Sequence, residues 1–99
     1  MVRKTGRVTP RGVVRLLNTA GGRVLCLAGA VDDGAVAAFL DRYGREPVRI
    51  DRIDAGSVTA LSPSGLALLR EHRAAAQWAG HPVTVVVGPV VERLLADDP

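Results

Sequence analysis

The sequence predicts an α/β protein in which a mixed sheet of about four strands packs with about three helices. Apolar, β-branched runs bounded by Gly or Pro alternate with segments whose apolar residues recur at helical spacing. The element types follow the order β-β-α-β-α-β-α. A short turn joins the first two runs, which favours an antiparallel pair, whereas helices join the later runs and favour parallel strands.

The strands are expected in four apolar segments. The first two, at 12–17 and 23–31, flank the turn at 18–22. A third is predicted at 47–54, where apolar and polar residues alternate as in a strand with one wet face, at or near a sheet edge. The valine-rich run at 82–87 predicts a buried fourth strand.

The helices have recognisable starts and stops. Asp32 marks the first start, because a carboxylate there accepts hydrogen bonds from exposed first-turn amides, and Gly44 ends that helix. Its apolar stripe falls at i, i+3, i+4 and i+7: Val36, Phe39, Leu40 and Tyr43. A second helix is predicted from Pro63 to Ala79, and Pro89 opens a third.

Length and composition predict one domain covering residues 1–99. Aromatic residues make up only 3% of the chain, so Val, Leu and Ala must fill the core, with Phe39, Tyr43 and Trp78 as its bulky side chains. Cys26 lies in an apolar run and is expected to be a small core residue, since a lone cysteine cannot form an internal disulfide.

The net charge of +3 is concentrated near the N-terminus, where residues 1–23 carry six basic side chains and no acid. Residues 1–11 are predicted to be a flexible basic segment. No base-reading motif accompanies these charges, so nucleic-acid binding is not expected. The sequence lacks a membrane-spanning apolar stretch and a signal-type segment, which favours a cytoplasmic protein without membrane insertion.

The most informative stretch for function is 58–69, in which a strand and loop lead into a helix. Ser62 can cap that helix and Pro63 suits its first turn. Ser64 then lies near the positive end of the helix dipole, where an attached phosphate would meet exposed amides. The alternative interpretation is that Ser-Pro-Ser-Gly is helix-start chemistry and nothing more.

The other chemically interesting residues favour structural roles. Asp54 is expected to end a strand and stabilise the following turn, and His72 and His81 to be structural or solvent-exposed. Trp78 and Phe39 are interpreted as packing groups. The sequence has no Cys/His cluster, no nucleophile–base pair at recognisable spacing and no Gly-rich phosphate loop, so no metal, cofactor or enzymatic activity is expected.

Four landmarks in order resemble the STAS family, whose members include anti-sigma-factor antagonists. Residues 29–32 (Gly-Ala-Val-Asp) resemble the family's Gly-Glu-Leu-Asp segment at a strand end. Residues 48–54, followed by Val58 and Thr59, resemble its central strand and the turn after it. Residues 62–66 (Ser-Pro-Ser-Gly-Leu) fall where the family has Asp-Ser-Ser-Gly-Leu, and 80–95 resemble its final portion.

The resemblance implies that Ser64 is phosphorylated by a partner kinase that also acts as an anti-sigma factor. It further implies that Asp32 is the acid near this serine. The partner-binding residues that it implies are Asp32, Ser62, Pro63, Gly65 and Leu66. The chain departs from the family pattern in having Ser62 in place of the motif's acid and Pro63 in place of its first serine.

An alternative remains within binding modules: a non-catalytic subunit of an ABC-type transporter ATPase complex. Small STAS-like proteins of about this length occur there, and the substituted acceptor motif fits a constitutive binder. The oligomeric state stays open at this stage, with a homodimer among the options.

Overall fold

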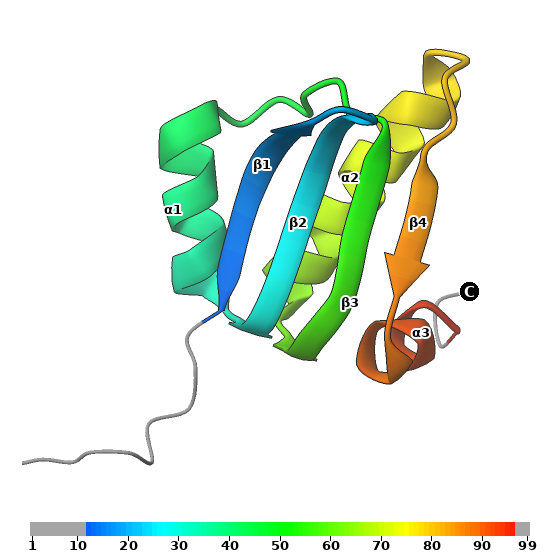
Figure 1. Cartoon of the computed structure of the whole chain (residues 1–99). Helices are drawn as coiled ribbons and strands as arrows, with labels where there is room; N and C mark the ends of the chain where they lie inside the picture. The colour runs from blue at the N-terminus through cyan, green and yellow to red at the C-terminus, as the bar shows by residue number, and fades with distance from the viewer. Residues whose placement is uncertain (1–11, 97–99) are drawn as a thin grey trace, which may run out of the picture.

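The computed structural model describes residues 12–96, which form an α/β fold with a four-stranded mixed sheet and three helices (Figure 1). The predicted flexible segment 1–11 lies outside the described residues. The elements, in chain order, are β1 (Val13–Thr19), β2 (Gly22–Val31), α1 (Asp33–Tyr43), β3 (Arg52–Leu61), α2 (Pro63–Trp78), β4 (Thr84–Val87) and α3 (Pro89–Ala96).

The strands lie in the sheet in chain order, β1-β2-β3-β4. β1 pairs with β2 antiparallel, while β2–β3 and β3–β4 are parallel, as the connection lengths predict. β3 has a neighbour on each side and lies next to the edge strand β4, so of the predicted positions, at or near a sheet edge, the second is the one observed. Its alternating sequence agrees with the predicted single wet face: α2 packs behind β2 and β3 in Figure 1, and the opposite face of these strands is free of helices.

The core lies between the sheet and the two longer helices. Leu25, Ile53 and Leu69 have no exposed surface, and α1 contributes Val36 and Phe39 to the same cluster. Burying each such side chain stabilises the fold by roughly 1.5–3 kcal/mol. α3 closes the core beyond the end of β4, where Val91 is fully buried.

Two predicted core residues lie elsewhere. Trp78 is 92% exposed, since it follows the buried His72 by six residues and therefore falls on the outer face of α2. Cys26 is half-buried between the core residues Leu25 and Leu27, so its side chain faces the helix-free side of the sheet. Burial, and then the charge of Asp54, raises the pKa of the Cys26 thiol, which keeps it protonated and weakly reactive.

Two predicted strand boundaries also shift. The third strand begins at Arg52 rather than at 47, and it passes Asp54 and continues to Leu61. Asp54 Oδ1 accepts a hydrogen bond from the Gly56 amide (3.1 Å) where β3 carries an extra residue relative to β2, so it stabilises a bulge and not a strand end. The fourth strand is a half-buried edge strand of four residues instead of a buried one.

His72 ties the irregular segment 47–50 to α2. It is only 3% exposed, its Nδ1 donates to the Leu68 carbonyl (3.0 Å), and its Nε2 accepts the Val48 amide proton (3.3 Å). The contact with Val48 requires the neutral imidazole, because Nε2 of a protonated ring carries a proton and cannot accept. Burial lowers the pKa of His72, in keeping with this state, and the structural role expected for this histidine is confirmed.

The buried neutral His72 makes stability depend on pH. Because its pKa is lower in the folded chain, the stabilisation is complete above the pKa of an unfolded histidine, about 6.5, and is lost as the pH falls below it. The loss is at most about 1.4 kcal/mol per pH unit. Urea unfolding between pH 7.5 and 5.5 should show this fall in the wild type and a smaller one in His72→Gln.

His81→Gln is the matched control, because it removes the other histidine and leaves His72 in place. It should retain the fall seen in the wild type. An unchanged pH dependence in His72→Gln would contradict the assignment of a buried neutral imidazole.

Candidate functional site

The N-termini of α1 and α2 lie together at the edge of the sheet where β2 and β3 end. Parallel strands joined by helices place successive helix starts at the same edge. The Ser62 amide donates to the Val31 carbonyl (2.9 Å), so the chain entering α2 is bonded to the end of β2. This edge carries most of the residues that the sequence singles out.

Asp32 caps α1, as predicted. Its backbone is extended (φ −112°), and Oδ1 accepts the Ala35 amide proton at 2.8 Å. Asp32 is exposed, so one carboxylate oxygen stabilises the helix start while the side chain remains accessible to a partner.

Ser62 caps α2 in the same way, because its Oγ accepts the Gly65 amide proton at 3.1 Å. Pro63 takes the first helical position and is exposed. Gly65 is buried against the strand ends, where an added Cβ would lie 2.6 Å from Leu61 Cδ1. Gly65 therefore allows the helix to approach the sheet, and it presents no side chain to a partner. Leu66 is half-buried.

A chain of hydrogen bonds connects the two helix starts through Ser64. The Ser64 hydroxyl donates to Asp33 Oδ1 at 2.5 Å, and the oxygens of Ser62 and Ser64 are 3.0 Å apart. Since Ser64 gives its only hydroxyl proton to Asp33, Ser62 is the donor in the second bond. This chain of hydrogen bonds from Ser62 through Ser64 to Asp33, called the relay below, fixes the Ser64 rotamer and holds α1 and α2 together at this end.

A groove of about 310 Å³ opens between α1 and α2 beside this relay. Val36 and Leu40 of α1 form one apolar wall, and Ala67 and Leu68 of α2 form the other. Half-buried Ser64 lies at the N-terminal end of the groove, and the charged side chains of Arg45 and Glu71 line its other end. The Ser64 oxygen therefore lies next to apolar surface that another protein can cover.

The acid in contact with the serine is Asp33, which the sequence analysis did not single out. Asp32 was expected near Ser64, but its carboxylate bonds the Ala35 amide and the next residue reaches the hydroxyl. The available signal was an acid in the first turn of α1. Whether this acid reaches Ser64 depends on how α1 packs against α2, and the spacing of residues along the sequence does not specify that packing.

Within residues 12–96 no group of three or more His, Cys, Asp or Glu side chains is placed to hold a metal ion. None of the helices in the described part of the chain is long and apolar enough to cross a membrane.

Comparisons with known proteins add no functional assignment. No family model, curated protein sequence or solved structure matches this chain.

Removal of the Ser62 cap should lower the stability of the fold by a measurable amount. Ser62→Ala leaves the Gly65 amide without its acceptor and should lower the free energy of unfolding by about 1 kcal/mol. Ser57→Ala is the matched control, because Ser57 is exposed on β3 and makes no side-chain hydrogen bond within residues 12–96. Chemical denaturation should separate the two variants, and equal stabilities would show that the cap contributes nothing.

The relay predicts coupling between α1 and α2. Asp33→Ala, Ser64→Ala and the double variant form a double-mutant cycle whose coupling energy we expect to be about 0.5–1.5 kcal/mol, the usual net value of one hydrogen bond. Asp32→Ala with Ser64→Ala is the matched control cycle and should be close to additive. A coupling near zero for Asp33 and Ser64 would contradict the relay.

Proposed function

We propose that the protein is a STAS-type regulatory binding module, cytoplasmic and without enzymatic activity. In this proposal it binds an anti-sigma kinase as an anti-sigma-factor antagonist, and phosphorylation of Ser64 gates the binding. The supporting observation is the position of the Ser64 hydroxyl, which joins two helix starts at the end of an open apolar groove.

A phosphoryl group on Ser64 is incompatible with the relay. It replaces the proton that Ser64 donates to Asp33, and it brings about −1.5 to −2 charges next to a carboxylate. The α2 amides offer little compensation, because Ser62 Oγ takes the Gly65 N–H and the Ser62 carbonyl takes the Leu66 N–H.

The electrostatic free energies favour a rearrangement of phosphorylated Ser64 over its staying beside Asp33. Two unit charges 4 Å apart repel by about 1 kcal/mol even in bulk water, so a dianion beside Asp33 costs about 2 kcal/mol. Attraction to the α2 dipole returns about 0.3–1 kcal/mol at an exposed site. Phosphorylation should therefore turn Ser64 away from Asp33 and change the surface at the groove entrance, while the core beneath stays intact.

A bound partner amplifies this effect. A protein covering the groove would enclose the dianion with only partial compensation, which costs several kcal/mol, and each 1.4 kcal/mol weakens binding tenfold. Unmodified Ser64, with its proton bound to Asp33, adds no charge there. The module should thus bind when unmodified and dissociate when phosphorylated.

The second candidate is a constitutive, non-catalytic subunit of an ABC-type transporter ATPase complex. One observation favours it: the hydroxyls of Ser62 and Ser64 are both already engaged in hydrogen bonds that hold the helix starts. In that function Ser64 is never modified, and the partner uses the groove permanently.

Affinity capture of the full chain from its host, with mass spectrometry of the partner and of Ser64, separates the two candidates. For a kinase partner, Ser64→Asp should weaken binding at least tenfold, whereas Ser64→Ala should bind well and accept no phosphate from ATP. Ser57→Ala is the control for a serine outside the groove and should behave as the wild type.

A kinase-like partner with phosphate on Ser64 in the unbound fraction would support the switch. Equal affinities of Ser64→Asp and Ser64→Ala for that partner would refute gating. A transporter ATPase bound to protein with unmodified Ser64 would establish the second candidate instead.

A further inference from the structure

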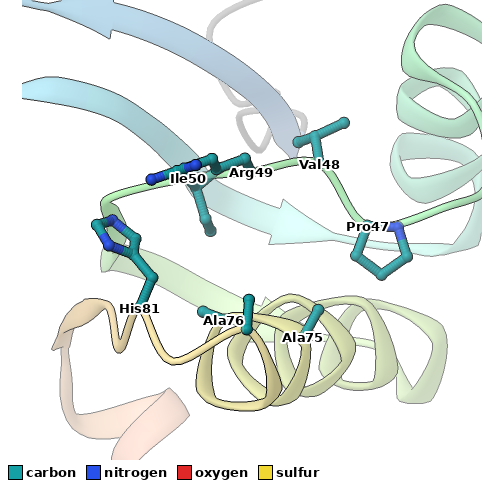
Figure 2. Close-up of a pocket in the computed structure, with 8 residues that line it drawn as sticks. Pro47, Val48, Arg49, Ile50, Ala75, Ala76 and His81 are labelled. Carbon is teal, nitrogen blue, oxygen red and sulfur yellow. The ribbon is translucent and has the colours of Figure 1, made fainter.

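A second concave site lies at the opposite end of α2 from Ser64. It is a pocket of about 250 Å³ between segment 47–50 and the last turns of the helix, and His81 closes one end (Figure 2). This volume is slightly below the range of ordinary ligand pockets, about 300–1,000 Å³, so only a small ligand would fit. Ala75, which lines this pocket, lies more than two helical turns beyond Ser64. The pocket and the Ser64 groove therefore share no lining residue.

Most of the pocket wall is apolar. Val48 and the buried Ile50 line one side, and three alanines of the α2 end line the other: Ala75, Ala76 and Ala79. The small alanine side chains leave this volume open, since a longer aliphatic side chain on that face would fill it. The wall thus fits a short hydrocarbon body.

The polar groups gather at one end of the pocket. Arg49 extends from segment 47–50 toward the end where His81 lies (Figure 2). Arg49 forms no hydrogen bond or ion pair with any other residue in 12–96, although its charge acts on Asp51. A guanidinium beside apolar walls is a bidentate binding group for a carboxylate.

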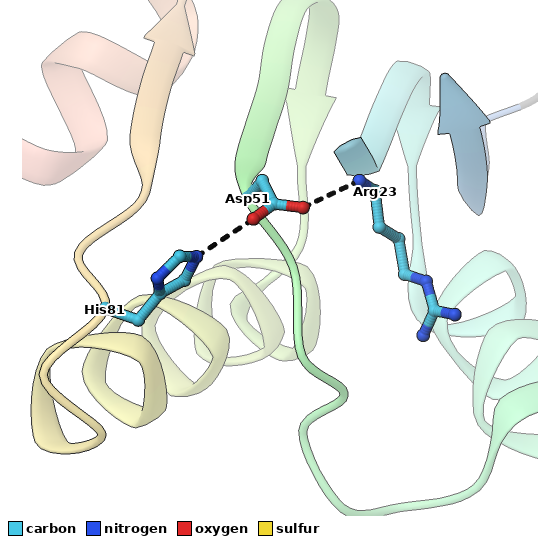
Figure 3. Close-up of polar contacts among 3 residues, drawn as sticks. All are labelled: Arg23, Asp51 and His81. Carbon is cyan, nitrogen blue, oxygen red and sulfur yellow. Dashed lines mark hydrogen bonds and ion pairs between the residues drawn. The ribbon is translucent and has the colours of Figure 1, made fainter. Parts of the chain in front are cut away.

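His81 is fixed by a second contact network (Figure 3). Its Nε2 bonds Asp51 Oδ1 at 2.9 Å, and Asp51 Oδ2 accepts the Arg23 amide proton at 2.9 Å. Hydrogen bonds from His81 and then Arg23 lower the pKa of Asp51, so its carboxylate stays ionised. Among the described residues, His81 Nδ1 has no hydrogen-bond partner and remains available.

We propose that this pocket binds a small organic monocarboxylate, with its short apolar body against the alanines of α2 and its carboxylate on Arg49. The charge balance favours one negative charge over two: Arg49 supplies a single full positive charge, and the ionised Asp51 nearby repels a dianion such as phosphate. The site is separate from the Ser64 groove and does not depend on the function proposed for it.

Titration followed by ¹H–¹⁵N NMR tests the assignment on the full chain. The probes are butanoate, 3-methylbutanoate and benzoate, each beside its neutral primary amide. We expect saturable shifts of the Val48, Ile50 and Ala76 amides for at least one acid, with a Kd of roughly 0.1–10 mM for so small a ligand. The matching amide should bind at least fivefold more weakly.

Variants separate the two halves of the site. Arg49→Gln should weaken the acid about tenfold, while Arg52→Gln, which removes a nearby exposed arginine outside the pocket, should leave its Kd unchanged. Ala76→Leu should abolish saturable binding by filling the pocket at little cost in helix propensity. If Ala76→Leu does not fold, Ala79→Leu at the exposed rim replaces it.

Three results would overturn the proposal: no saturable shift for any acid up to 50 mM, equal binding of acid and amide, or an unchanged Kd in Arg49→Gln. Saturable binding that persists in the filled-pocket variant would place the ligand elsewhere and would also reject this site.

Discussion

The packing of the helices against one face of the sheet is the constraint on which the other features depend. Leu25, Ile53 and Leu69 are fully buried between α2 and the central strands, and this contact fixes the height of α2 above the sheet. Gly65 lets the first turn of α2 approach the strand ends closely, and the Ser62 amide then reaches the Val31 carbonyl. The position of the serine pair thus follows from how the core closes beneath it.

The two ends of α2 differ in chemistry because different elements meet there. At the N-terminal end two helix starts converge, so unpaired amides, capping carboxylates and hydroxyls gather, and Ser64 becomes the link between them. At the C-terminal end the helix faces an irregular segment, 47–50, and small side chains leave space instead of a packed contact. A polar relay and a small pocket therefore share one helix, more than two turns apart, and neither uses the residues of the other.

The irregular entry to β3 depends on polar side chains, since segment 47–50 lacks strand pairing of its own. His72 accepts the Val48 amide proton from inside the core. Asp51, which directly precedes β3, links the start of β2 to the loop before β4. Gly22, beside the Asp51 side chain, has a positive φ of 120°, and a Cβ there would overlap Asp51 Oδ2, so the carboxylate occupies the space of a missing side chain. These contacts compensate backbone groups that a regular strand would pair.

The sequence by itself determined the order of the elements, the antiparallel and parallel pairings and both helix caps, because these depend on neighbouring residues: side-chain periodicity, connection length and an oxygen placed before a helix. The tertiary structure decided what depends on distant residues. It placed Trp78 in solvent and Cys26 on the helix-free face, since both outcomes depend on which face of the sheet and of α2 is covered. It also chose Asp33 over Asp32 as the partner of Ser64, because the angle between two packed helices, and not spacing along the chain, decides which carboxylate reaches the hydroxyl.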